Sequence, residues 1–351
     1  MSAPGLLVHR LRAPFGAAPG LEQISFSVAP GERLALVGAS GAGKTTLLRA
    51  IAGLGPGGAD RLEIGGREVG ALPAERRGVV YLHQTPLLFP HLTVGENIAF
   101  PLRVRGAHSS DIGPAVRDVM AALRLDGLGE RRVQSLSGGQ RHRAALARAI
   151  VARPTVLLLD EPFAGLDPVL RHEVREAVRA AQASYRPALV LVTHDLDEAG
   201  TLADRIGVLL HGRLAQVGPP SELFARPATL EVARFLGLAN SVLGTIEDDG
   251  RFASPLGLLP AGLPLAPGPA VAVFATGAIR TAADGPLIGR LVELRHRVQQ
   301  TTAVVVAGGV RLEVVLDGER RVAIGEEVRL AIAMEAVSIF ADATPTGFRR
   351  G

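Results

Sequence analysis

Residues 33–45 read RLALVGASGAGKT, and this stretch decides the fold. The apolar segment Arg33–Val37 predicts a short strand, and the residues from Lys44 to about Ala52 predict a helix. Between them, Gly38–Thr45 fits the pattern GxxxxGK[ST]. Glycines at this spacing let successive backbone N–H groups face inward, and the helix adds its positive N-terminal end. The stretch therefore predicts a loop that cradles phosphate groups, and a bare glycine turn is the disfavoured alternative.

Lys44 is the single lysine among the 38 Lys and Arg residues of the chain. A chain that uses arginine for every other such cation keeps lysine here, which indicates a place for a compact ammonium group rather than a planar guanidinium. In a phosphate loop of this kind the lysine reaches the β- and γ-phosphates, and the hydroxyl of Thr45 ligates Mg²⁺. Both residues are therefore candidates for binding ATP and Mg²⁺.

A later strand is expected to end in two acids. Val156–Leu159 is a continuous apolar run, as in a strand buried on both faces, and Asp160 and Glu161 follow it directly. The carboxyl ends of parallel strands border the ligand crevice of such sheets. We expect Asp160 to hold Mg²⁺ through water and Glu161 to polarise the attacking water. The alternative is a pair of acids that only caps the next turn.

A second helix start with anion-binding character follows the motif Leu136–Gln140, LSGGQ. Ser137 is a favourable N-cap residue, and Gly138 and Gly139 leave the first turn without side chains, so that a phosphate could approach it closely. One nucleotide needs only one such helix start, and this chain has two. An ordinary cap followed by a flexible glycine pair is the alternative interpretation.

Strand and helix patterns alternate through the first two thirds of the chain, which predicts an α/β fold with a parallel sheet. A helical pattern covers about residues 86–153. After about Leu238 short alternating runs replace the helices and predict a small all-β domain, built as a barrel. These runs are Ala270–Phe274, Leu287–Leu294, Thr302–Val306, Arg311–Val315, Glu327–Ile332 and Val337–Phe340.

Composition excludes several classes of protein. The chain has 351 residues, enough for about two domains, and 47% of them are hydrophobic, which excludes a disordered chain. It has no cysteine, so disulfide scaffolds and thiolate sites are excluded, and a net charge of +4 gives no argument for nucleic acid. Residues 252–279 carry no charge, but prolines interrupt them repeatedly, which argues against a membrane helix. We expect a soluble protein without a signal peptide that reaches a membrane only through a partner.

The ordered set Gly38–Thr45, Gln84, Leu136–Gln140, Asp160-Glu161, Ala164–Asp167 and His194 resembles the ATPase subunit of ABC transporters. The resemblance covers about residues 1–237. It implies a P-loop NTPase (RecA-like) core with an antiparallel β subdomain and an inserted helical subdomain at about 86–153, followed by an OB-like barrel over 238–351. It also implies a homodimer in which two subunits pair head to tail, each ATP lying between the phosphate loop of one and the LSGGQ helix of the other.

The resemblance assigns roles to single residues. Glu161, His194 and Lys44 would be catalytic, with His194 at the γ-phosphate, and Gln84 would join Thr45 and Asp160 around Mg²⁺ and signal to a membrane partner. Phe15 would stack on adenine, and Asp167 would pair across the dimer. Further nucleotide contacts are expected from Gly38, Ser40, Gly41, Ala42, Gly43, Thr46, Ser137, Gly138, Gly139 and Gln140.

The resemblance also suggests what hydrolysis drives. Leu87–Leu92 is an apolar run in an expected loop after Gln84, which indicates a groove for a short helix of a membrane permease; a core-facing loop is the alternative. The C-terminal segment resembles the TOBE-like regulatory domain of importer ATPases, and Phe274–Arg280 and Val337–Phe340 are most like the ferric-iron type. Importers of molybdate, sulfate, polyamine or thiamine carry related tails and remain alternatives.

The leading hypothesis is an importer ATPase, peripheral on the cytoplasmic face of the cell membrane, that powers permease subunits and acts indirectly with a substrate-binding protein. A soluble ABC ATPase of DNA repair or translation would carry tandem cassettes or a long coiled-coil insertion, and a P-loop kinase would lack Leu136–Gln140. A ligand sensor built on the β domain is the third alternative.

Overall fold

The computed structural model describes residues 4–15, 18–260, 265–296, 301–316 and 322–341. By packing, the chain divides into two compact units, Met1–Pro220 and Ser221–Gly351. The domain boundary expected at residues 237 and 238 stays a prediction. The packing division falls earlier because helix α8 (Leu230–Phe235) buries Ala233 against Val271 and Val273 of the second unit.

A largely parallel sheet forms the centre of the first unit. In the described part of the chain its strand order is β10-β9-β3-β8-β7-β6, and only β10 runs antiparallel to its neighbour. The central strands β7 and β8 are buried along their whole length, which explains their uninterrupted Val and Leu runs. The strands are β3 (Arg33–Val37), β6 (Val79–Leu82), β7 (Val156–Asp160), β8 (Ala188–Thr193), β9 (Arg205–Leu210) and β10 (Arg213–Gly218).

A second sheet of the same unit is antiparallel, in the order β2-β1-β4-β5. Its inner side chains, Val8 and Ile24 among them, form one buried cluster with Leu47 and Ile51 of helix α1 (Lys44–Ala52). The helix that follows the phosphate loop is therefore held between the two sheets. The strands of this sheet are β1 (Leu6–Phe15), β2 (Ala18–Val28), β4 (Arg61–Ile64) and β5 (Arg67–Glu68).

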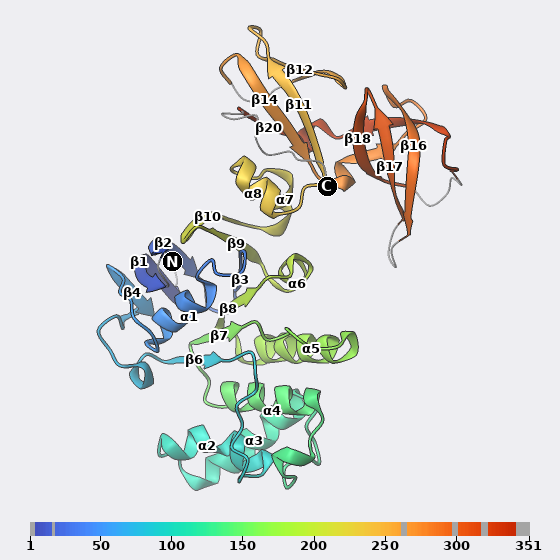
Figure 1. Ribbon diagram of the computed structural model, residues 1–351. Coiled ribbons are helices and arrows are strands. Elements are labelled where there is room, and N and C mark those ends of the chain that lie inside the picture. Colours follow the sequence, from blue (N-terminus) through green and yellow to red (C-terminus); the bar gives the residue numbers. More distant parts are fainter. Residues whose placement is uncertain (1–3, 16–17, 261–264, 297–300, 317–321, 342–351) are drawn as a thin grey trace. The chain divides into compact units, whose positions relative to one another are not determined.

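The other helices of this unit cover the parallel sheet or gather beyond its β6 edge, where α2, α3 and α4 lie together (Figure 1). These three fall inside the segment for which a helical subdomain is expected, and α4 packs on both α2 and α5. No helix among the described residues is long and apolar enough to cross a membrane. The bounds are α2 (Val94–Val104), α3 (Ser109–Ala122), α4 (Gly138–Ile150), α5 (Pro168–Tyr185) and α6 (Leu196–Leu202), with short 3-10 turns at Ala74–Arg76 and Val133–Ser135.

The second unit is mostly β structure, as expected. Its described strands form a sheet in the order β13-β12-β11-β14-β20 and a closed barrel in the order β15-β18-β17-β16-β19, with one shared core. Asn240, which is fully buried, joins the two because its side chain hydrogen-bonds the backbone N–H and C=O of Glu313. Helix α7 spans Pro220–Ala225, and 3-10 turns lie at Thr276–Ala278 and Met334–Ala336. The strands are β11 (Asn240–Ile246), β12 (Arg251–Ser254), β13 (Gly257–Pro260), β14 (Gly268–Phe274), β15 (Ile279–Thr281), β16 (Leu287–His296), β17 (Thr301–Ala307), β18 (Val310–Val315), β19 (Glu327–Ile332) and β20 (Ser338–Ala341).

An ion pair fastens the start of the strand that leads into the phosphate loop. Arg33 Nη2 donates to Asp204 Oδ1 at 2.7 Å, and the backbone N–H of Arg33 donates to Asp204 Oδ2 at 2.9 Å. The hydrogen bond from the Arg33 side chain lowers the pKa of Asp204 below its usual value. The pair thus ties the start of β3 to the start of β9, and its strength depends on pH.

Asp204→Asn is expected to destabilise the protein at neutral pH but much less in acid. A carboxyl whose pKa is lower in the folded than in the unfolded chain stabilises fully above the unfolded value near 3.8 and loses this contribution as the pH falls through the folded value. The check is urea unfolding of both proteins at pH 7, 5, 3 and 2. Asp126→Asn, at an exposed carboxyl, is the control. A difference that stays constant down to pH 2 would contradict this account.

Candidate active site

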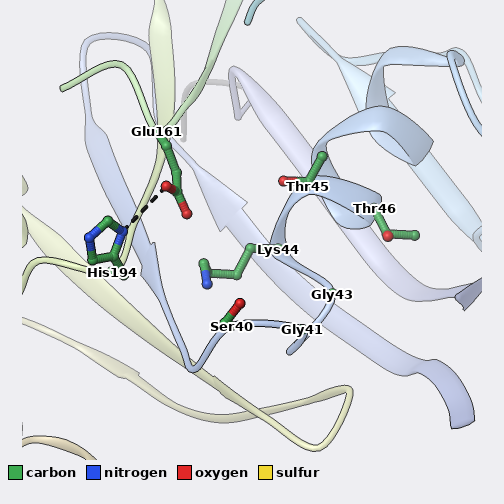
Figure 2. A pocket seen from close by; sticks show the side chains of 8 residues that line it. All are labelled: Ser40, Gly41, Gly43, Lys44, Thr45, Thr46, Glu161 and His194. Carbon is green, nitrogen blue, oxygen red and sulfur yellow. Dashed lines mark ion pairs between the residues drawn. The ribbon is translucent and has the colours of Figure 1, made fainter. Parts of the chain in front are cut away.

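The candidate site is a cavity of about 510 Å³ where three parallel strands end. Strand β3 runs into the phosphate loop, β7 is followed by Glu161, and β8 is followed by His194. Figure 2 shows Lys44 extending into the cavity between the loop and the Glu161–His194 pair. The lining residues are Ser40, Gly41, Gly43, Lys44, Thr45, Thr46, Glu161 and His194.

The loop has its shape because glycine stands at two demanding positions. Gly43 has φ 96°, a left-handed conformation that side chains disfavour, and it immediately precedes α1. A Cβ on Gly38 would lie 2.4 Å from the carbonyl oxygen of Leu209 on β9. The loop can therefore lie directly against the sheet and expose its N–H groups to the cavity.

Lys44 is buried, with 6% of its surface exposed. Its Nζ donates to the carbonyl oxygens of Gly38 at 2.8 Å and Ala39 at 3.1 Å. Burial lowers the pKa of Lys44, while the nearby carboxylates of Glu161 and Asp160 act in the opposite direction. The carbonyl groups of the phosphate loop thus hold the ammonium group at the cavity wall.

Asp160 is also buried and its two carboxylate oxygens have different partners. Oδ1 accepts a hydrogen bond from Thr45 Oγ1 at 2.9 Å, and Oδ2 accepts one from the hydroxyl of Tyr81 at 2.6 Å. Burial is the largest cause that raises the pKa of Tyr81, and the hydrogen bond to Asp160 is the second. The phenol therefore keeps its proton and remains a donor. A hydroxyl and a carboxylate at this separation form a small set of hard oxygen ligands.

Glu161 and His194 form a pair at the far wall of the cavity (Figure 2), with His194 Nδ1 3.3 Å from Glu161 Oε2. Glu161 has φ 45°, the left-handed region that costs a non-glycine residue about 1–2 kcal/mol. Its backbone N–H donates to the carbonyl of Val192 at 3.0 Å, which fixes it to the neighbouring strand. The strained turn thus directs the carboxylate away from the sheet and toward the cavity.

His194 stands on a turn with its own polar support. Thr193 Oγ1 donates to Glu198 Oε2 at 2.7 Å and accepts from the backbone N–H of Asp195 at 3.0 Å. Asp195 caps α6 by accepting from the N–H of Glu198 at 3.0 Å. Glu198 is 4% exposed, and burial raises its pKa. The imidazole itself is largely exposed and free to meet a ligand in the cavity.

The arrangement suits one kind of chemistry. A cradle of N–H groups and an ammonium bind a polyphosphate, a hydroxyl–carboxylate pair offers oxygen ligands, and a second carboxylate beside an imidazole faces the same space. Attack of water on a terminal phosphate needs all three functions at one place.

Known proteins match most of the chain. Residues 21–164 match the family described as ABC transporter. A molybdate/tungstate import ATP-binding protein of Thermococcus kodakarensis is 43% identical over 239 residues, 68% of this chain and 72% of the relative. The chain belongs to the ABC transporter family. A spermidine/putrescine import ATP-binding protein of Legionella pneumophila is 42% identical over 68% of this chain and 66% of the relative. An Fe(3+) ions import ATP-binding protein of Rhizobium meliloti is 42% identical over 72% of both chains.

This protein is therefore an importer-type ABC ATPase that binds ATP and couples its hydrolysis to transport. The P-loop NTPase fold with a small β-barrel unit, expected from the sequence, is confirmed. The oxygen donors around Asp160 fit Mg²⁺, which takes few protein ligands and completes its shell with water and phosphate.

The LSGGQ helix start of this ABC ATPase does not line the cavity of its own chain. Ser137 caps α4 in a capping box: its Oγ accepts from the N–H of Gln140 at 3.2 Å, and Gln140 Oε1 accepts from the N–H of Ser137 at 3.0 Å. Gly139 has a packing role as well, because a Cβ there would lie 2.2 Å from Leu170 Cδ1 on α5. Ser137 is exposed, so this end of the helix is open to a ligand from outside the chain.

Apart from residues 137–140, the expected site residues that do not line the cavity are Gln84, Asp160, Asp167, Gly38 and Ala42. Gln84 follows β6 and is exposed. Asp167 caps α5 by accepting from the N–H groups of Val169 and Leu170, both at 3.0 Å, so it has a role within its own chain. Phe15 ends β1, and its side chain lies outside the part of the structure that is described. Two further loop residues pack inward: Gly38 lies against Leu209 of β9, and Ala42 is buried in the core of the unit.

Two features of this ABC ATPase were not predicted from its sequence. The bond from Tyr81 to Asp160 depends on the register of β6 against β7, which pairs Tyr81 with Leu158 and places Tyr81 on the same face as Asp160. A single tyrosine in a four-residue strand gives no sign of this. The left-handed backbone of Glu161 could not be predicted from the sequence either, because glycine and asparagine are the residues that usually adopt this conformation.

Proposed function

We propose that two copies of this chain pair head to tail and hold each ATP between the phosphate loop of one copy and the Ser137–Gln140 helix start of the other. One observation carries the proposal. The chain presents a capped, exposed helix start that its own cavity does not use. The backbone N–H groups in the first turn of such a helix favour an anion, so the helix start suits the γ-phosphate of an ATP bound by the other copy.

Within each pocket the residues have separate tasks. The loop N–H groups and Lys44 bind the phosphates, and Thr45 and Asp160 hold Mg²⁺, with Gln84 joining them from the loop after β6. Bound Mg²⁺ would neutralise phosphate charge. Glu161 polarises the attacking water and accepts its proton, and His194 contacts the γ-phosphate from the turn after β8. The left-handed Glu161 and its 3.3 Å contact with His194 support this division.

The same closing motion would drive a membrane permease. Side chains of Leu87, Phe100 and Val104 are exposed by 58%, 39% and 70%, and the Phe89 ring, 4.6 Å from Phe100, joins the loop after Gln84 to α2. The loop is held in place by Asn97, which is fully buried and hydrogen-bonds the backbone of Phe89 in both directions. An apolar patch on such a rigid support suits a short permease helix. The chain would thus act at the cytoplasmic face of the membrane, peripherally, with permease subunits and indirectly a substrate-binding protein.

The cargo we propose is an inorganic ion, with ferric iron as the first candidate. The relatives named for Fe(3+) and for sulfate/thiosulfate import align over 254 and 253 residues, against 239 and 240 for those named for molybdate/tungstate and for spermidine/putrescine. The longer alignments thus favour an inorganic ion, and sulfate remains an alternative to iron. Uptake of labelled iron, sulfate, molybdate, spermidine and thiamine by cells with and without the chain distinguishes these cargoes.

Ser137→Asp should abolish ATP-driven pairing while leaving ATP binding by the single chain intact. Aspartate caps a helix as well as serine does, so α4 keeps its start. The new carboxylate would repel the partner's γ-phosphate. The measurement is light scattering with ATP in a Glu161→Gln background, beside binding of a fluorescent ATP analogue.

Thr93→Asp is the matched control, because Thr93 caps α2 through the same capping box but faces no expected nucleotide. We expect it to pair as the parent does. If the Ser137→Asp protein also forms normal pairs in the presence of ATP, the proposal that two chains share each nucleotide is wrong.

A further inference from the structure

We propose that Tyr81 is a positioning residue that fixes which oxygen of Asp160 is presented to Mg²⁺·ATP. The inference rests on the proposed function, in which Asp160 and Thr45 hold the metal. It adds to that function a residue outside the motifs that predicted the site.

Strand register brings the two side chains together. Strands β6 and β7 pair in parallel, with Tyr81 opposite Leu158. Side chains alternate along a strand, so Leu158 and Asp160 share a face of β7 and Tyr81 projects from the same face of β6. The resulting bond from the Tyr81 hydroxyl to Asp160 Oδ2 is 2.6 Å long.

The bond gives the carboxylate a definite orientation. With Oδ2 tied to Tyr81, Oδ1 faces Thr45 at 2.9 Å, on the side of the phosphate loop. Asp160 is only 7% exposed, so solvent offers little substitute for a lost donor. Without the phenol, Oδ2 would be left without this donor, and the carboxylate would be free to turn away from the Thr45 side.

Hydrogen-bond partners behind a metal ligand commonly change metal affinity by 10- to 100-fold when they are removed. The ring of Tyr81 has a separate role, because it packs against the core of the unit and lies edge-on to His83, with 4.5 Å between ring centroids. Tyr81→Phe keeps that ring and removes only the hydroxyl. The variant therefore isolates the bond to Asp160.

The first test is binding of a fluorescent ATP analogue at increasing Mg²⁺. We expect Tyr81→Phe to bind the analogue without Mg²⁺ as the wild type does, and to need roughly 10- to 100-fold more Mg²⁺ for the metal-dependent gain in affinity. The control is Tyr185→Phe at the C-terminal end of α5, which removes the only other phenol of the chain. An unchanged Mg²⁺ requirement in Tyr81→Phe would overturn the inference.

The second test uses the composition of the chain, which has two tyrosines and no tryptophan. In Tyr185→Phe the near-ultraviolet tyrosine signal comes from Tyr81 alone. Adding Mg²⁺·ATP should perturb that signal, and adding ATP with a chelator should not. No perturbation, in a protein that shows Mg²⁺-dependent binding, would also overturn the inference. Wild-type protein that binds ATP without any Mg²⁺ dependence would instead refute the proposed metal site.

Discussion

Replacing Glu161 by glutamine is expected to slow ATP hydrolysis by on the order of 10²-fold or more. The amide keeps the shape of the side chain and its contact with His194, but it cannot accept a proton from the attacking water. ATP binding should persist, because the phosphate cradle and Lys44 are untouched. Phosphate release and nucleotide binding, measured on the same preparation, check both halves of the expectation.

The matched control for that experiment is Glu176→Gln. Glu176 is on α5, partly exposed and paired with Arg179 at 2.7 Å, outside the cavity lining. The same carboxylate-to-amide change should leave turnover near the wild-type rate there. Wild-type turnover in Glu161→Gln would remove Glu161 from its role, and loss of ATP binding would show that the substitution disturbs the loop.

Lys44→Arg preserves the charge and is still expected to reduce hydrolysis by on the order of 10²-fold or more. The ammonium is enclosed by the loop and donates to the carbonyls of Gly38 and Ala39. A planar guanidinium is larger and has a fixed geometry, so it cannot occupy this place without displacing the loop. Binding of ATP should weaken as well, which titration calorimetry measures directly.

Arg49→Lys, the reverse exchange on the exposed face of the same helix, is the control. It should change neither ATP affinity nor turnover. A Lys44→Arg protein with wild-type activity would mean that the loop needs only a positive charge, and the argument from the single lysine would fail.

Parts of the fold with strong local signals were predictable. The phosphate-loop helix begins at Lys44 and ends at Ala52, as the pattern indicates, and the apolar run before Asp160 is a strand buried on both faces. The C-terminal runs are strands of a sheet and a barrel. In contrast, strands β12 and β13 fall at the start of the proline-interrupted stretch 252–279, for which the sequence only argued against a membrane helix. Their formation depends on pairing, since β12 pairs with β11 and β13 with β12.

The candidate site, like the fold, was predictable only where local motifs specify it. The motifs predicted which chemical groups would meet, and strand ends bring Lys44, Glu161 and His194 to one cavity. Whether Ser137 and Asp167 contact nucleotide stays a prediction, since both are helix caps in the single chain. Backbone conformation at Glu161 and the partner of Asp160 arise from three-dimensional packing, which no local pattern encodes.

The contact between Gly139 and Leu170 has a mechanical consequence. With no side chain at residue 139, the first turn of α4 lies directly on the first turn of α5, whose cap is Asp167. We expect the two helix starts to move together, so that a displacement of Ser137 also displaces Asp167. A bulkier residue at position 139 would wedge the two helix starts apart and uncouple them.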